Sequence, residues 1–225
     1  MLALVGSGEY LPGMEGVDRY LLASLNDEPR VVCLPTAAGT EGAERIAYWS
    51  DLGSSYFARL GVQAKALPVI TRQDAQDAAL ANRIREASFV YLSGGRPDYL
   101  LATLKDSLVW EAILSVIARG GVLAGCSAGA MVQGAWIPGF PKRQRAFNLL
   151  PGAVVVPHYD ELPSWMGRFL RLWIGRNGRM LGIPGYTALV VDGEACRVVG
   201  RGSVTVWNGA GKRSYVEGET FLWQL

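Results

Sequence analysis

The sequence predicts an α/β protein with a mostly parallel sheet covered by helices on both faces and an antiparallel C-terminal extension. Short, uncharged aliphatic segments alternate with helical segments, which is typical of strands buried on both faces of a parallel sheet. Several of these segments end in glycine-containing turns. From residue 181 onward, short strand-like segments follow one another and are separated by Asp-Gly and Asn-Gly turn signals.

Each element is expected from its own pattern of residues. The strands of the parallel sheet are expected at residues 2–5, 31–34, 63–69, 89–92 and 122–124. Helices are expected at residues 16–25, 41–60, 74–86 and 162–174, with two more inside 97–119. The antiparallel strands are expected at residues 187–191, 197–199, 204–207, 214–216 and 220–223. No linker or repeat interrupts this order, so residues 1–225 are expected to form a single domain.

The composition excludes several classes of protein. Half of the 225 residues are hydrophobic and 19% are charged, whereas roughly 25% are charged in an ordinary soluble domain. A disordered chain or a polyelectrolyte tail is therefore excluded. The net charge of +2 is too small to attract nucleic acid non-specifically, so we expect no nucleic-acid partner.

Cysteine and histidine usage points to a metal-free protein of the cytoplasm. Cys33, Cys126 and Cys196 are far apart and odd in number, so they form no disulfide framework and no C-x-x-C pair. His158 is the only histidine, and a histidine-rich zinc site cannot be built within one chain.

No segment predicts secretion or a membrane span. The first residues lack a positively charged region, and their apolar run stops at Gly6. The longest uncharged stretch, residues 120–141, contains six glycines and two prolines. We interpret this stretch as a strand, a tight turn and a short helix, and we expect no membrane association.

The segment Gly125-Cys126-Ser127-Ala128-Gly129 fits the nucleophile elbow, G-x-S-x-G. In this motif a strand turns sharply into a helix, and the central hydroxyl is exposed at the start of that helix. An aliphatic strand precedes the motif and small residues follow it, as the elbow requires. The alternative is a glycine-rich turn with a buried serine. Cys126 is a rival nucleophile, but alanine stands where its own frame would need glycine, so it is expected to point into the core.

A serine nucleophile needs a base, and His158 is the one imidazole available. It follows Val154-Val155-Val156-Pro157, which reads as the end of a strand. The carboxyl ends of parallel strands share one edge of the sheet, so we expect His158 and Ser127 to meet there. Otherwise His158 is a surface or capping residue.

A third motif, Ser93-Gly94-Gly95, also ends a strand. Paired glycines let the backbone approach a ligand closely. One N–H of this turn and the N–H of Ala128 can form an oxyanion hole.

Together these motifs resemble the serine peptidase family of dipeptidase E and cyanophycinase, whose fold is similar to class I glutamine amidotransferases. Further resemblance lies in Leu34-Pro35-Thr36-Ala37, in Leu60-Gly61-Val62 and in Phe147-Asn148-Leu149-Leu150, and it covers residues 1–200 in order. It implies that Ser127 is the nucleophile, His158 the general base, and Gly95 and Ala128 the oxyanion donors. It implies no cofactor or metal. Gly94 and Arg96 are candidate substrate-binding residues, and Arg96 stands where relatives often have Asn or Asp.

The triad acid is absent from both places where this family carries it. Dipeptidase E has an aspartate between serine and histidine, but residues 128–157 contain no Asp or Glu. Cyanophycinase-like members have a Glu where this chain has Gly185. Asp160 is our leading candidate for the orienting acid; Glu161, Asp98, a backbone carbonyl or a second subunit are the alternatives. Asp160 and Glu161 otherwise cap the helix expected at 162–174.

Basic and aromatic residues surround the histidine in sequence. Dipeptidase E prefers an N-terminal aspartyl residue, so Arg168 and Arg171 are candidate substrate-binding residues, unless they line a solvated helix face. Lys142, Arg143 and Arg145 add to this positive charge. Aromatic and aliphatic residues at helical spacing predict a core or homodimer face rather than a ligand cage. They are Trp165, Phe169, Leu172 and Trp173.

The sequence as a whole predicts a cytoplasmic serine peptidase that hydrolyses a small peptide, with an aspartyl peptide as the candidate substrate. Two alternatives remain open. One is an amidotransferase-like binding protein that has lost catalysis, which the absent acid favours. The other is an amidase or esterase that uses the same nucleophile.

Overall fold

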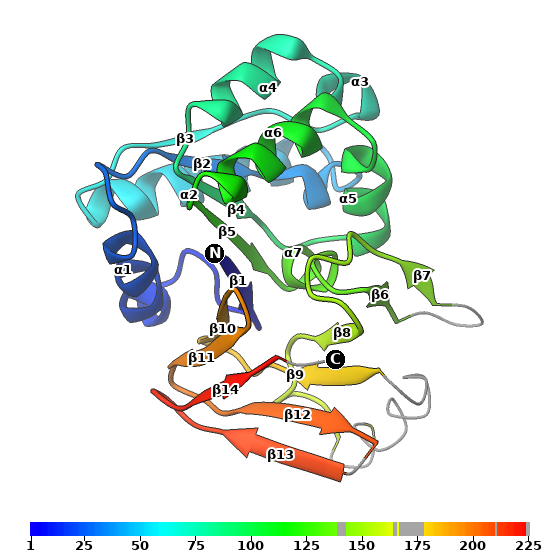
Figure 1. Cartoon of the computed structure of the whole chain (residues 1–225). Coiled ribbons are helices and arrows are strands. Elements are labelled where there is room, and N and C mark those ends of the chain that lie inside the picture. Colours follow the sequence, from blue (N-terminus) through cyan, green and yellow to red (C-terminus); the bar gives the residue numbers. More distant parts are fainter. Residues whose placement is uncertain (139–142, 164–165, 167–177, 210, 224–225) are drawn as a thin grey trace.

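The chain forms two β-sheets: a larger one that helices cover, and a smaller one beside it (Figure 1). The computed structural model describes residues 1–138, 143–163, 166, 178–209 and 211–223. The main sheet has eight strands in the order β14-β11-β10-β1-β5-β4-β2-β3. The second has six, in the order β13-β12-β9-β8-β6-β7.

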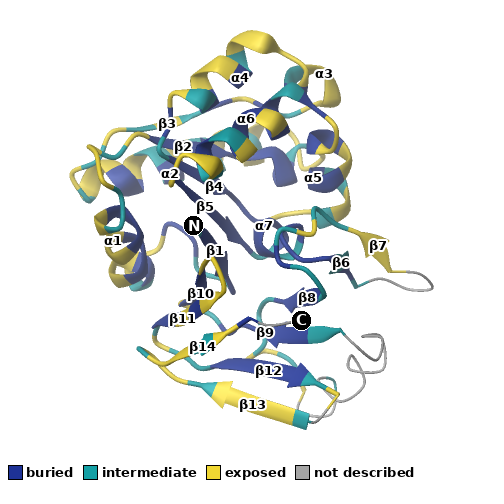
Figure 2. Cartoon of the chain, in the orientation of Figure 1, coloured by how far each residue is buried: buried dark blue, intermediate teal, exposed yellow. Residues whose placement is uncertain are grey.

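The main sheet has a parallel half and an antiparallel half. Its parallel strands are β1 (Leu2–Val5), β2 (Val31–Leu34), β3 (Ala64–Ala66), β4 (Phe89–Leu92) and β5 (Val122–Cys126). The antiparallel strands are β10 (Thr187–Asp192), β11 (Ala195–Gly200) and β14 (Thr220–Leu222). All residues of β1, β2, β4 and β5 are buried, which explains their uninterrupted apolar sequences (Figure 2).

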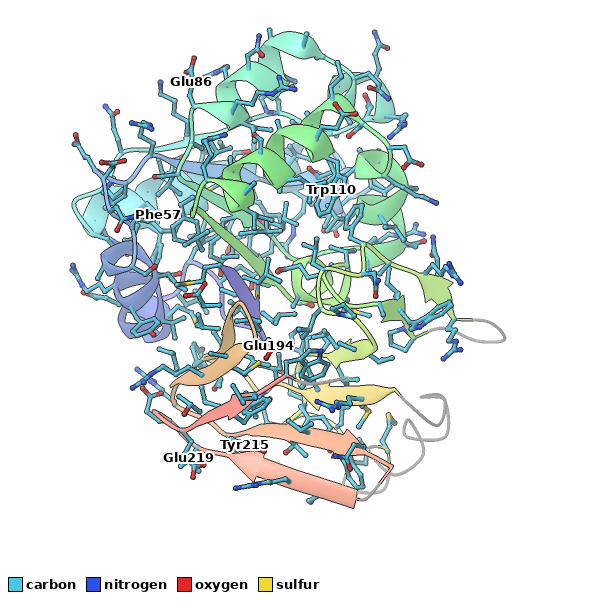
Figure 3. All side chains as sticks on the ribbon, viewed as in Figure 1. Phe57, Glu86, Trp110, Glu194, Tyr215 and Glu219 are labelled. Atoms are coloured by element: carbon cyan, nitrogen blue, oxygen red, sulfur yellow. The ribbon has the colours of Figure 1, made fainter. Side chains whose placement is uncertain are left out.

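Helices cover both faces of the parallel half. One face carries α1 (Glu15–Ala23) and α2 (Ala43–Arg59). The other carries α3 (Arg72–Ala75), α4 (Ala78–Arg85), α5 (Pro97–Leu104), α6 (Leu108–Ala118) and α7 (Ala128–Met131). Each face has its own cluster of buried apolar side chains. Phe57 belongs to the cluster beneath α1 and α2, and Trp110 to the cluster on the other face (Figure 3). The side chains of each strand contribute to these two clusters in turn, because successive side chains of a strand point to opposite faces of the sheet.

The second sheet lies beside the antiparallel half (Figure 1). Its strands are β6 (Trp136–Ile137), β7 (Gln144–Arg145), β8 (Ala153–Val156), β9 (Arg179–Gly182), β12 (Val204–Asn208) and β13 (Gly211–Tyr215). β8 pairs in parallel with both β6 and β9, whereas β12 and β13 are antiparallel additions. The chain leaves this sheet after β8 and reaches His158 through Pro157.

The predicted fold class is confirmed, with two differences in detail. The helix expected over residues 74–86 is two helices, because Thr71 and Asp74 form a capping box on α3 and the Asp77 carboxylate caps α4. The C-terminal strands were expected as one meander, but they are divided between the two sheets. β12 pairs with β9 of the second sheet, and β13 pairs with β12. Nearly all of the helix expected at 162–174 lies outside the described residues.

No helix in the described part of the chain is long and apolar enough to cross a bilayer. The uncharged stretch 120–141 instead forms β5, the short helix α7 and β6 before its last residues leave the described part. This matches the expected strand, turn and short helix.

Helix α1 carries a buried carboxyl group, that of Asp18. Asp18 is fully buried, and its Oδ2 accepts a hydrogen bond from the Tyr56 hydroxyl at 2.7 Å. Its Oδ1 has no partner among the described residues. Burial raises the pKa of Asp18 from 3.8 to about 7, against the opposing effect of the Tyr56 hydrogen bond.

We expect this carboxyl to make stability depend on pH. The folded protein holds a proton that the unfolded chain releases between the two pKa values, so the stabilisation is complete below pH 3.8 and is lost as the pH rises to about 7. The loss is about 4 kcal/mol at most. Asp18→Asn should flatten this slope in denaturant unfolding measured across the pH range. An equal slope in the variant and the wild type would contradict the expectation.

Candidate active site

Ser127 lies at the end of β5 in a strained backbone conformation. Its φ is 50° and its ψ is −107°, a combination that costs roughly 1–3 kcal/mol and persists only when neighbours hold it. Three backbone hydrogen bonds do so: the Ser127 N–H donates to the Val5 carbonyl, and the Ser127 carbonyl accepts from Ala130 and Met131, each at 3.0 Å. This is the geometry of a nucleophile elbow.

The two glycines of the elbow have no room for a side chain. A Cβ on Gly125 would lie 2.3 Å from the Gly129 carbonyl oxygen. A Cβ on Gly129 would lie 2.5 Å from the Leu92 carbonyl oxygen. The G-x-S-x-G pattern therefore reflects tight packing between the start of α7 and strands β4 and β5.

His158 reaches Ser127 from the second sheet. It follows β8 and Pro157, has a positive φ of 51°, and has 41% of its side chain exposed. Its Nε2 lies 3.2 Å from the Ser127 Oγ, a distance at which a general base can take up a hydroxyl proton. The structure thus brings together the two residues that the sequence singled out.

The other ring nitrogen faces Glu161. The His158 Nδ1 lies 3.0 Å from the Glu161 Oε1. The Glu161 N–H donates to the His158 carbonyl at 3.0 Å, so residues 158–161 form a turn that folds the Glu161 side chain back to the ring. When Nδ1–H donates to this carboxylate, Nε2 is left bare to accept the serine proton.

Asp160, the acid expected to orient the ring, has a different partner. Its Oδ1 accepts a hydrogen bond from the Gly185 N–H at 2.9 Å. The turn brings residue 161 close to residue 158 and directs residue 160 toward the loop before β10. A Cβ on Gly185 would lie 2.9 Å from the Ser7 Oγ and 3.5 Å from Asp160. Ser7 and the Asp160 carboxylate therefore lie where a side chain at position 185 would begin.

The Gly94–Gly95 turn presents one backbone donor near the serine. The Gly94 N–H donates to Glu9 and the Arg96 N–H to the Ala37 carbonyl, each at 2.9 Å. The N–H groups of Gly95 and Ala128 have no acceptor within the described part of the chain. Gly94 lies against Ser127, since a Cβ on it would be 3.5 Å from the Ser127 Cβ. The Gly94 N–H is taken by Glu9, and the substrate contact expected of Gly94 stays a prediction.

The neighbour of the serine, Cys126, is unsuited to nucleophilic attack. It is fully buried, and its thiol donates to the Glu9 Oε2 at 2.9 Å. Burial, together with the charge of Glu9, raises the pKa of this thiol well above its usual value. Cys126 points into the core, as expected. Glu9, which the sequence analysis did not single out, carries no recognisable motif around it.

The charged residues expected at the substrate side are only partly placed. Arg96 is exposed and pairs with Asp98 at 2.5 Å; this hydrogen bond lowers the pKa of Asp98, so Asp98 serves Arg96 and not the histidine. The guanidinium carbons of Arg143 and Arg145 lie 4.1 and 5.3 Å from the centre of the Trp136 ring. The remaining candidates lie outside the described residues: Lys142, Trp165, Arg168, Phe169, Arg171, Leu172 and Trp173.

One cavity among the described residues lies at the other end of strand β1 from the elbow. No group of three or more His, Cys, Asp or Glu side chains in the described ranges is placed to hold a metal ion. A cavity of about 730 Å³ is lined by Met1, Leu2, Ile117 and Trp223. It lies at the start of β1, whereas Ser127 lies beyond the end of that strand, where Val5 pairs with Cys126. We therefore place the chemistry at the elbow.

The chain is similar to proteins that are named peptidase or cyanophycinase. The chain is similar to a crystal structure of a peptidase from an acI-B1 actinobacterium, with a TM-score of 0.90, 34% identity and coverage of 98% of this chain and 96% of that one. It is 27% identical to the Listeria monocytogenes protein named "Uncharacterized peptidase Lmo0363" over 59% of this chain and 67% of that protein. It is 28% identical to a cyanophycinase from Trichormus variabilis, over 92% and 72% respectively.

The family assignment rests on nearly the whole chain. The sequence model of peptidase family S51 matches residues 2–199, which include the elbow, the glycine turn, the histidine and the turn that follows it. The expected resemblance to dipeptidase E and cyanophycinase is thereby confirmed. This chain belongs to peptidase family S51.

Proposed function

We propose that this protein is a serine peptidase in which Ser127, His158 and Glu161 form the catalytic triad. The observation that carries the proposal is the continuous chain of contacts, 3.0 Å from Glu161 to Nδ1 and 3.2 Å from Nε2 to the serine oxygen. This is the arrangement by which a serine hydroxyl is activated at neutral pH. This chain has no acid at the two positions where the family carries one, and Glu161, three residues after the histidine, takes that role in the proposal.

The reaction follows from this geometry. The Ser127 oxygen attacks the peptide carbonyl carbon while its proton moves to the His158 Nε2, and Glu161 stabilises the resulting imidazolium. The oxygen of the tetrahedral intermediate accepts hydrogen bonds from the Gly95 and Ala128 N–H groups. The C–N bond then breaks, and the departing amine takes the proton from Nε2. Water attacks the acyl-enzyme by the same route and releases the acid product.

The proposed substrate class is a small peptide, and an acidic N-terminal residue would suit the basic side chains on the second sheet. Arg143 and Arg145 stack on Trp136, whose strand β6 pairs with β8. Because β8 leads to His158, these cations stand on the sheet that carries the base. A guanidinium suits a carboxylate ligand. Three free and buried cysteines are compatible with the reducing cytoplasm that we propose as its location.

The two other functions predict different results at the same site. The absence of an acid favoured a binding protein without catalysis, and the proposed role of Glu161 argues against it. An amidase or esterase would share the triad, and a panel of dipeptides, amides and esters separates these activities from peptide hydrolysis.

We expect a fluorophosphonate probe to label the wild-type protein at Ser127. Ser127→Ala should abolish labelling, and Cys126→Ala should keep it, because the thiol is buried and protonated. Mass spectrometry of the labelled peptide locates the adduct. An unlabelled wild type, or an adduct that persists in Ser127→Ala, would overturn the proposal.

A further inference from the structure

A buried glutamate lies beneath the proposed site. Glu9 is 8% exposed and sits at the centre of a turn closed by the hydrogen bond from the Leu11 N–H to the Gly8 carbonyl at 3.1 Å. Charged side chains are almost never buried to this extent unless their polar atoms are satisfied. Its two oxygens should therefore have specific partners.

Both partners belong to motifs of the proposed active site. The Glu9 Oε1 accepts a hydrogen bond from the Gly94 N–H at 2.9 Å. The Oε2 accepts one from the Cys126 thiol, also at 2.9 Å. Gly94 precedes the oxyanion donor Gly95, and Cys126 precedes the nucleophile Ser127. One side chain thus connects strands β4 and β5 at the point where each of them ends.

The next residue, Tyr10, holds the same turn from the other side. Its hydroxyl lies 3.0 Å from the Ser93 Oγ, and its ring is buried against Tyr91 with 4.8 Å between ring centres. Tyr10 has a positive φ of 61°. This conformation is uncommon for a bulky residue. In it, the Glu9 side chain reaches Gly94 while the next side chain, that of Tyr10, reaches Ser93.

These contacts determine which backbone N–H is free. Glu9 takes the N–H of Gly94, and the Ala37 carbonyl takes that of Arg96 at 2.9 Å. Gly95 lies between them with a φ of 138°, and a Cβ on it would be 2.5 Å from the Ala37 oxygen. The Gly95 peptide is therefore fixed on both sides, and its own N–H has no acceptor among the described residues.

We propose that Glu9 is a positioning residue that fixes the oxyanion donor Gly95 relative to the nucleophile Ser127. This inference rests on the proposed function. Glu9 acts through Gly94 and Cys126, and it takes no proton in the reaction. Oxyanion donors stabilise the transition state only when they are held in place beforehand, and a displacement of about 1 Å can cost roughly 100-fold in rate.

Two substitutions of similar size test this role through the rate of fluorophosphonate labelling. Glu9→Gln keeps an oxygen that can accept from Gly94, so we expect its labelling rate within about threefold of wild type. Glu9→Met fills the space without an acceptor, so we expect a rate about 10- to 100-fold lower, because the adduct carries an oxygen in the same hole. Asp18→Asn is the matched control: it removes a second buried carboxyl group, which is hydrogen-bonded to Tyr56 and not to Gly94 or Cys126, and it should label at the wild-type rate.

The end point and the pH profile separate positioning from loss of folded protein. In Glu9→Met, labelling should be slow but should reach the same final fraction of chains, and its pH midpoint should match wild type because His158 is untouched. Three results would overturn the positioning role of Glu9 and leave the proposed function standing. They are a wild-type labelling rate in Glu9→Met, an equal loss of labelling rate in Glu9→Gln, and a loss in Glu9→Met that affects only the final labelled fraction. An unlabelled wild type overturns both this inference and the proposed function.

Discussion

Replacing His158 by alanine is expected to lower peptide turnover by about six orders of magnitude. Removal of the base from a serine triad costs about as much as removal of the whole triad, because the three residues act as one unit. The chain contains one histidine, so no neighbouring imidazole can substitute. Turnover of the best dipeptide of the panel measures the effect, with circular dichroism to verify the fold.

The double variant Ser127→Ala/His158→Ala provides the control for this prediction. Since the serine is inert without its base, the double variant should be no less active than His158→Ala alone. A His158→Ala protein that retains more than about a hundredth of wild-type turnover would show that His158 is not the base.

Glu161→Gln is expected to lower turnover by about four orders of magnitude, with little change in stability. The amide keeps the size of the side chain but can donate to Nδ1, which favours the tautomer with its proton on Nε2. Loss of the triad acid through such a change costs about 10⁴ in turnover in serine proteases. The Glu161 side chain is 66% exposed, so its loss should hardly affect folding.

Asp160→Asn is the matched control for Glu161→Gln. It changes the adjacent carboxylate by the same chemistry, but Asp160 binds the Gly185 N–H, and an amide oxygen can still accept that bond. We expect turnover within about tenfold of wild type. If Asp160→Asn is the inactive variant and Glu161→Gln the active one, the roles of the two acids are reversed.

Local patterns sufficed for most of the fold and for part of the site. Several aliphatic strands end at glycine turns, and those of the parallel sheet are almost entirely buried, so both their position and their parallel pairing were predictable. Ser127 could be found because the elbow is a local motif, and His158 because it is the only imidazole and ends a strand.

The remaining features depend on tertiary structure that no local pattern encodes. The choice between Asp160 and Glu161 depends on the turn at His158, whose φ of 51° brings residue 161 to the ring. Glu9 meets residues 85 and 117 positions further along the chain. The second sheet contains β6 and β7, each of two residues, and such short strands leave no periodicity to recognise.

The tautomer of the lone histidine tests the triad most directly. With ¹⁵N-labelled histidine, nuclear magnetic resonance reports on His158 alone. We expect the neutral ring to carry its proton on Nδ1, in a hydrogen bond to Glu161, with Nε2 bare; Glu161→Gln should abolish this state and Asp160→Asn should preserve it. A wild-type ring with its proton on Nε2, or an Nδ1 proton unaffected by Glu161→Gln, would contradict the Ser127–His158–Glu161 triad.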